Sequence, residues 1–249
     1  KNMEKVLLEI CVDSIESAKA AVLAGHVRLE LCSALSEGGL TPTSGFVHVV
    51  KQLHREHQAF AMLRPRRGDF CFNETERSVL LHDINALKDA GADGFVFGAL
   101  TECGEIDEEL CSAVITSAGN LPVTFHRAFD LTKEEDCMKN CAKIVKLGFK
   151  RLLTSGFRAT AEEGMHYIKM LNETFGDKII IMPGAGINAE NVRRIADTTK
   201  CREIHASARR PKKQSPSRIS MGGAASDMEP QMVTNYEIAH QMLLNLQHP

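Results

Sequence analysis

The chain has 249 residues, and its 30 basic and 32 acidic side chains leave a formal net charge of −2. Apolar residues make up 43% of the sequence and charged residues 25%, which excludes an intrinsically disordered chain. The near-neutral charge argues against a nucleic-acid partner. No apolar run approaches the roughly 18 residues that a membrane helix needs, so no membrane partner is expected.

The cysteine content bears on the cellular compartment. Lys1–Lys5 are followed by only three apolar residues before Glu9, which is not the core of a signal peptide. We therefore expect a cytosolic protein whose eight cysteines are reduced thiols rather than disulfides.

Short apolar and β-branched runs alternate with helical segments along the chain. Eight strands are predicted, beginning near residues 6, 27, 59, 94, 123, 151, 179 and 203. Crossover helices make such strands parallel, so the pattern predicts a single-domain (β/α)8 barrel, or TIM barrel, over residues 1–249. The alternative, an open doubly wound sheet, calls for a glycine-rich motif after the first strand, and none is present there.

The first two predicted strands share one pattern, Leu-Glu-hydrophobe-Cys, at residues 8–11 and 29–32. Side chains alternate along a strand, and carboxylates avoid the dry helix layer, so the Glu and Cys positions are expected to face the barrel interior. Functional groups of such barrels lie at the carboxyl ends of the strands. We place ten groups at this mouth: Glu9, Cys11, Glu30, Cys32, Arg64, Arg66, His126, Thr154, His205 and Ser207.

This polar set has two interpretations. The carboxylates of Glu9 and Glu30 could form internal ion pairs with Arg28, Arg64 or Arg66. Ten polar or thiol groups at one end exceed what packing requires, however, and this favours a binding or catalytic pocket.

The pocket interpretation gives candidate residues for two roles. An anion or substrate site is predicted from Arg64, Arg66, His126, Thr154, Gly184, Gly186 and His205. Glycines after the seventh strand let backbone N–H groups approach an anion, although tight turns also need glycine, and the segment 220–223 is expected to complete the site. The candidates for proton transfer are Glu9, Glu30 and His126. Fold alone assigns no reaction to them.

Two thiols and one basic segment allow further hypotheses. Cys11 and Cys32 lie on neighbouring predicted strands, about 4.8 Å apart, where thiolates at matching heights could share one soft ion such as Cu(I). The alternative is that each is a small buried hydrophobe. The basic segment 209–218 is expected to be a surface loop, with a nuclear-localisation signal or a cover over the mouth as alternatives.

Longer motifs resemble the CutC copper homeostasis proteins. They are Glu9–Ser14, Arg28–Ser33, Leu35–Gly39, Met62–Arg66, Asp93–Glu102, Leu121–Asp130, Leu153–Gly156, Met182–Ile187 and His205–Ala208. The resemblance covers nearly the whole chain. It implies a (β/α)8 barrel, a cytosolic and in animals also nuclear location, self-association as a homodimer or homotetramer, and Cu(I) binding tied to copper tolerance.

The resemblance also bears on individual residues. Cys11 and Cys32 match the positions suspected of holding Cu(I), so one Cu(I) per subunit is expected there. Ala206 stands where animal members can carry cysteine, which removes a third thiol. An enzyme that acts on a small phosphorylated or carboxylated substrate at the barrel mouth remains the alternative function, with a small anion as its ligand.

Overall fold

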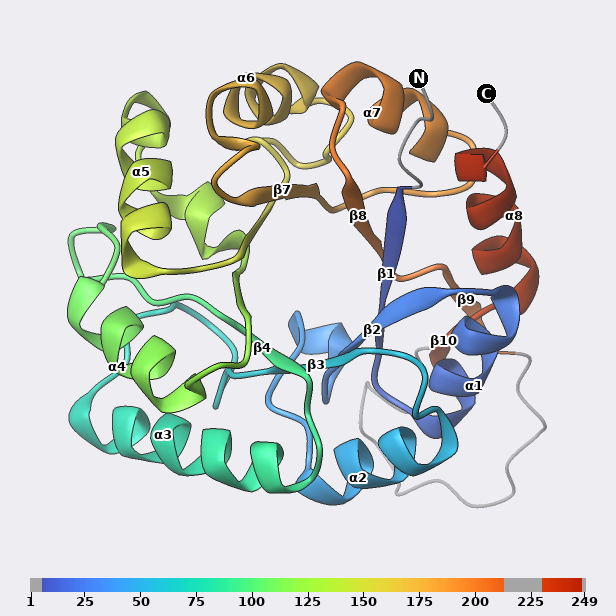
Figure 1. Cartoon of the computed structure of the whole chain (residues 1–249), viewed down its shortest axis with the longest axis horizontal. Coiled ribbons are helices and arrows are strands. Elements are labelled where there is room, and N and C mark those ends of the chain that lie inside the picture. Colours follow the sequence, from blue (N-terminus) through green and yellow to red (C-terminus); the bar gives the residue numbers. More distant parts are fainter. Residues whose placement is uncertain (1–5, 213–229, 248–249) are drawn as a thin grey trace.

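Eight parallel strands ring the centre of the molecule, with the helices outside them (Figure 1). The computed structural model describes residues 6–212 and 230–247. The strands are β1 (Leu7–Val12), β2 (Val27–Leu31), β3 (Ala59–Met62), β4 (Gly94–Phe97), β5 (Val123–Phe125), β6 (Arg151–Thr154), β7 (Ile180–Pro183) and β8 (Glu203–Ala206). Each begins within one residue of its predicted start, and the single-domain (β/α)8 barrel is confirmed.

A ring of helices covers the outer face of the barrel (Figure 1). They are α1 (Ile15–Ala24), α2 (Ser44–Leu53), α3 (Glu74–Asp89), α4 (Glu108–Ala118), α5 (Cys137–Leu147), α6 (Met165–Phe175), α7 (Val192–Thr199) and α8 (Tyr236–Gln247). None of these described helices is long and apolar enough to cross a membrane.

The alternation of side chains along the strands separates two apolar layers. Leu8, Ile10 and Leu29 are fully buried in the layer between strands and helices, as their parity predicts. A smaller cluster that contains Phe60 and Met62 lies inside the barrel. The opposite parity of Glu9 and Glu30 therefore directs their carboxylates into the interior, where both are buried.

The ring of strands has one seam. Backbone ladders run continuously in the order β7-β6-β5-β4-β3-β2-β1-β8. In the described part of the chain no ladder joins β7 to β8, so the barrel is nearly closed. Gly184, just after β7, leaves room for the side chain of Leu153 on β6, because a Cβ there would lie 2.5 Å from Cδ1 of Leu153.

The basic segment 209–218 begins as regular structure. Strand β9 (Arg209–Pro211) pairs antiparallel with β10 (Met232–Thr234), and this hairpin leads into α8. Residues 213–218 and the predicted anion-binding segment 220–223 lie outside the described residues. The predictions made for them stay predictions.

Candidate functional site

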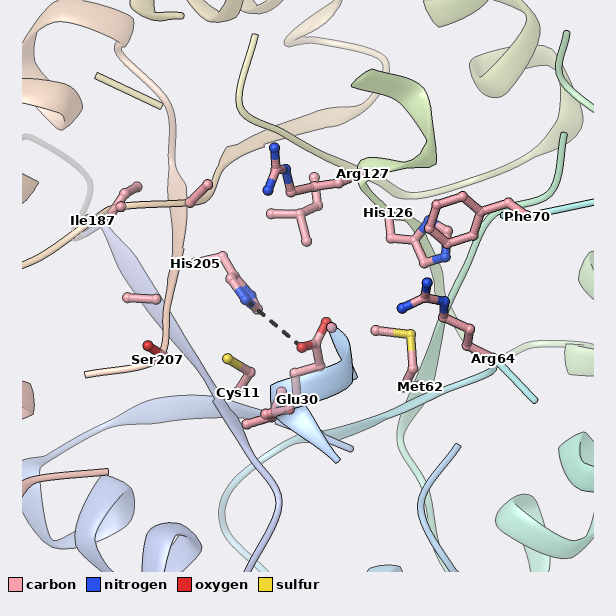
Figure 2. A pocket seen from close by; sticks show the side chains of 16 residues that line it. Cys11, Glu30, Met62, Arg64, Phe70, His126, Arg127, Ile187, His205 and Ser207 are labelled. Atoms are coloured by element: carbon pink, nitrogen blue, oxygen red, sulfur yellow. Dashed lines mark ion pairs between the residues drawn. The ribbon is translucent and has the colours of Figure 1, made fainter. Parts of the chain in front are cut away.

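The carboxyl ends of the strands surround a cavity of about 300 Å³. Figure 2 shows Cys11, Glu30 and His205 on one side of this cavity and Arg64, Phe70 and His126 on the other. Its lining comprises Cys11, Glu30, Leu35, Gly38, Met62, Arg64, Phe70, His126, Arg127, Leu153, Ala185, Gly186, Ile187, His205, Ala206 and Ser207. Of the predicted groups, the structure thus brings together Cys11, Glu30, Arg64, His126, Gly186, His205 and Ser207.

Glu9 belongs to an internal charge network and not to the cavity lining. Its Oε2 lies 2.5 Å from Nε of Arg28, and Arg28 also binds Glu203 on β8. Arg151 on β6 joins the same carboxylate of Glu203, with 2.7 Å between Nε and Oε2. The internal ion-pair interpretation is therefore right for Glu9. It is wrong for Glu30, which forms no ion pair with an arginine among the described residues.

The register of β1 and β2 decides which groups meet. It pairs Cys11 with Glu30, so the expectation that Cys11 and Cys32 lie at matching heights is wrong. His205 on β8 pairs with Glu9. The Nδ1 atom of His205 lies 2.9 Å from Oε1 of Glu9, and its Nε2 lies 3.8 Å from Oε2 of Glu30. One potential ligand atom from each of Cys11, Glu30 and His205 lies within 4.8 Å of the other two.

Cys32 lies on the far side of Glu30, two residues beyond the position that matches Cys11. Its Sγ is 3.5 Å from Oε2 of Glu30. It packs with Phe60 and Met62 inside the barrel and does not line the cavity. Burial, and then the Glu30 carboxylate, raises the pKa of the Cys32 thiol. In the free protein this thiol is therefore protonated.

Burial and charge act in opposite directions on the neighbouring groups. Burial alone would raise the pKa of Glu9, but Arg28 and His205 outweigh it and lower that pKa to about 2. Burial would lower the pKa of His205, yet the charges of Glu30 and Cys11 raise it well above its ordinary value. Burial raises the pKa of Glu30. A fixed carboxylate thus holds one end of His205, while burial disfavours the charged form of Glu30.

Three predicted binding residues lie away from the cavity. Arg66 follows the end of β3, where strand alternation no longer holds, and it points to Glu76 with 2.5 Å between Nε and Oε1. The Thr154 hydroxyl is buried and donates to Asp130. Gly184 leaves room for the Leu153 side chain, which a Cβ at this position would approach to 2.5 Å. None of these three positions lines the cavity.

The cavity also contains a group that the predicted set omits. Arg127, at the start of a 3-10 helix over Arg127–Leu131, donates to Asp130 with 2.9 Å between Nε and Oδ2 and to Oγ of Ser155 at 2.8 Å. Asp130 accepts further bonds from the backbone N–H and the hydroxyl of Ser155, both at 3.0 Å. The Arg-x-x-Asp spacing after the fifth strand is the sequence signal for this arrangement.

Comparison with known proteins identifies the family. The CutC family model matches residues 6–210. The chain is 46% identical over 227 residues to the copper homeostasis protein cutC homolog of Homo sapiens, which covers 90% of this chain and 82% of that one. It is 41% identical over 239 residues to the Caenorhabditis elegans homolog, covering 95% and 94%. A solved CutC structure from Streptococcus agalactiae aligns with a TM-score of 0.75 at 31% identity, covering 80% of this chain and 97% of that one. The chain therefore belongs to the CutC family of copper homeostasis proteins.

Proposed function

We propose that this protein binds Cu(I) at the barrel mouth, one ion per subunit, and thereby contributes to copper tolerance. The observation that carries the proposal is the hydrogen-bonded contact between Nδ1 of His205 and Glu9, at 2.9 Å. Histidines that ligate metals characteristically donate one ring N–H to a carboxylate and bind the metal through the other nitrogen. Here the other nitrogen, Nε2, lies near the thiol of Cys11.

The donor chemistry fits a soft ion. Thiolate sulfur and imidazole nitrogen both suit Cu(I), whereas carboxylate oxygen suits harder cations. Cys11 and Nε2 of His205 are therefore the best-placed ligands in the described chain. Cys32, which flanks Glu30, is the second thiol that the family resemblance implies. Its approach to the ion would require a change in the position of its side chain.

Titration with Cu(I) against a colorimetric chelator tests this proposal. Cys11→Ser, Cys32→Ser and His205→Gln should each weaken Cu(I) binding by at least about tenfold. Cys201→Ser is the matched control, because Cys201 is equally buried but lies away from the cavity. Unchanged stoichiometry and affinity in a Cys11→Ser/Cys32→Ser double variant would refute the site. A parallel Zn(II) titration is needed, because the Cys11–Glu30–His205 set also offers ligands that zinc accepts.

A second candidate function is proton-transfer catalysis on a small phosphorylated or carboxylated substrate. Glu30 favours it, because its Oε1 is buried at the cavity and has no hydrogen-bond partner among the described residues. Glu9, the other predicted carboxylate, would act by orienting His205. Small acids incubated with the protein in D2O should gain deuterium at carbon, and Glu30→Gln should abolish the exchange. Absence of exchange or turnover across such a panel would count against this function.

We also propose self-association, as a homodimer or homotetramer, and a cytoplasmic and nuclear location. The exposed apolar side chains of Leu23 and Leu131 support the first proposal. Sedimentation at micromolar concentration should give a species larger than the 27.4 kDa of one chain. Cell fractionation tests the second proposal, and recovery only with membranes would contradict it.

A further inference from the structure

The cavity wall opposite Cys11 carries hydrogen-bond donors that have no acceptor. His126 is 4% exposed, and its Nδ1 accepts a hydrogen bond from the backbone N–H of Ala128 at 3.2 Å. The proton of the neutral ring must therefore be on Nε2. This Nε2–H is buried and has no partner in the described structure. A buried donor left without an acceptor is costly, and it marks the place where a ligand atom fits.

The His126 ring is held firmly in this orientation. It packs against Phe70 with 4.7 Å between ring centroids. Gly98 leaves room for it, because a Cβ at that position would lie 2.5 Å from Nδ1. Burial, and then the charge of Arg64, lowers the pKa of His126 to about 3, so the ring stays neutral. The donor is thus fixed both in direction and in protonation state.

Arg64 contributes a second fixed donor beside His126 (Figure 2). Its Nη1 donates to the carbonyl of Glu37 at 3.1 Å and its Nη2 to the carbonyl of Gly68 at 2.9 Å. These two bonds fix the guanidinium in place and use two of its five N–H donors. Its buried Nε–H remains without a partner in the described structure.

The rim of the same cavity adds main-chain donors. The backbone N–H groups of Ala185, Gly186 and Ile187 donate to no acceptor within the described residues. All three residues line the cavity. Ala185 and Gly186 have φ values of 82° and 68°, which turn this loop away from the strand direction. Arg127, held by Asp130, brings a positive charge to the cavity.

We propose that the barrel mouth binds a small hydroxylated organic anion, whose carboxylate or phosphate oxygens accept hydrogen bonds from this wall. The donors of this wall are Arg64 and His126. Arg127 and the backbone N–H groups of 185–187 add to them, and Ile187 lies on the His205 side of the cavity (Figure 2). On the opposite side, the partnerless Oε1 of Glu30 matches a hydroxyl group of the ligand. A cavity of about 300 Å³ is at the small end for ligand sites, which fits a molecule of a few carbons.

This inference rests on the second candidate function only in placing a small molecule at the mouth. It requires neither copper nor any reaction. The Cys11 thiol supplies none of these hydrogen bonds, so Cys11→Ser should lose Cu(I) and keep the anion. Failure of anion binding and failure of copper binding are therefore separate results.

Calorimetry and thermal shift with three matched probes test the inference on the metal-free protein. Glycerate carries a carboxylate, glycerol 3-phosphate carries a phosphate, and glycerol carries neither. At least one anionic probe should bind saturably below about 10 mM, and glycerol should not. Binding of glycerate alone identifies a carboxylate ligand, and binding of glycerol 3-phosphate alone identifies a phosphate ligand. Failure of both anions to bind saturably, or equal binding of glycerol, overturns the inference.

Two arginines provide a matched comparison. The side chains of Arg127 and Arg158 are 43% and 41% exposed, and each pairs with a carboxylate, but only Arg127 lines the cavity. Arg127→Gln should weaken probe binding by about tenfold or more, and Arg158→Gln by less than about twofold. Equal effects of the two substitutions would overturn the inference.

His126→Phe removes the Nε2 donor and should also lower the affinity for the anionic probe by about tenfold. If this variant does not fold, the nitrogen-bound proton of His126 can be followed by NMR in the wild type. Saturating probe should shift that resonance. An unchanged resonance would show that His126 does not contact the ligand and would refute its role.

Discussion

The Glu9 carboxylate bridges two residues from neighbouring strands, with Oε1 2.9 Å from Nδ1 of His205 and Oε2 2.5 Å from Nε of Arg28. All three side chains are buried or nearly so. The carboxylate is therefore both a structural counter-ion for the guanidinium and the group that orients the imidazole toward the cavity. Stability and site geometry depend here on the same side chain.

Removing the charge of Glu9 should lower the stability of the folded protein. Glu9→Gln leaves Arg28 with one carboxylate fewer in a dry interior, and breaking a buried pair in this way costs about 3–5 kcal/mol. Urea unfolding at pH 7 measures the loss. Glu16→Gln is the control, because Glu16 forms an exposed ion pair with Lys212. This substitution should lower the free energy of unfolding by less than about 1 kcal/mol. Equal stability of the two variants would contradict the role given to Glu9.

The neutral state of His126 should make stability fall in mild acid. Its pKa is lowered to about 3 in the folded protein, by burial and then by Arg64, while the unfolded chain takes up the proton near the ordinary value of 6.5. Below pH 6.5 protonation therefore favours the unfolded state, by up to about 1.4 kcal/mol per pH unit. Between pH 7 and 5.5 the wild type should lose about 1 kcal/mol more than His126→Phe does. Urea unfolding of His82→Gln, altered at an exposed histidine on α3, should keep the wild-type pH dependence.

Two glycines should respond oppositely to alanine. Gly98→Ala places a Cβ 2.5 Å from Nδ1 of His126, so the ring must move, and we expect a loss of about 1–3 kcal/mol. A Cβ added at Gly45 on α2 would meet nothing within 4 Å, and Gly45→Ala should stabilise the helix by roughly 0.5–1 kcal/mol. Thermal denaturation separates the two. Unchanged stability in Gly98→Ala would show that His126 has room to shift.

Asp130, in the 3-10 helix after β5, should matter for both stability and anion binding. Its carboxylate accepts bonds from Arg127 and Ser155, and it also accepts one from the Thr154 hydroxyl. Asp130→Asn turns one acceptor oxygen into a donor and should cost about 1.5–3 kcal/mol. Asp130→Asn should also lower the affinity for the anionic probes, as Arg127→Gln does.

The control for this substitution is Asp136→Asn, since Asp136 lies near the surface with 3.8 Å between its Oδ1 and Nζ of Lys139. Its effect on the free energy of unfolding should stay below about 1 kcal/mol. If Asp130→Asn binds the probes as the wild type does, Arg127 does not depend on Asp130 for its position.

Strand positions and facing directions could be predicted because they follow from local patterns. The β-branched runs indicated where β1 to β8 begin, and alternation placed Glu9 and Glu30 inside. Alternation along a strand, however, predicts which face of the sheet a side chain is on. It does not predict how far along the barrel axis the side chain lies. The stagger between β1 and β2, which matches Cys11 with Glu30, depends on the closure of the whole barrel.

The remaining differences arise where strands end. β3 ends at Met62, so the alternation used for Arg66 had no physical basis beyond that residue. Backbone carbonyls of Glu37 and Gly68, in the loops around the mouth, then occupy the Arg64 guanidinium. Contacts between residues distant in sequence, such as Thr154 at the end of β6 with Asp130 in the 3-10 helix, leave no periodic signal in either segment.

The ladder between β8 and β1 has a consequence for the order in which the barrel can close. The first strand of the barrel keeps one unpaired edge until the last strand docks against it. Glu203 on that same strand is also the second counter-ion of Arg28. A nascent chain that lacks β8 therefore has both an open edge and an unbalanced charge at its centre, and its interior cannot exclude water. Closure of the barrel therefore has to wait for β8, which covers the open edge of β1 and supplies the second counter-ion of Arg28.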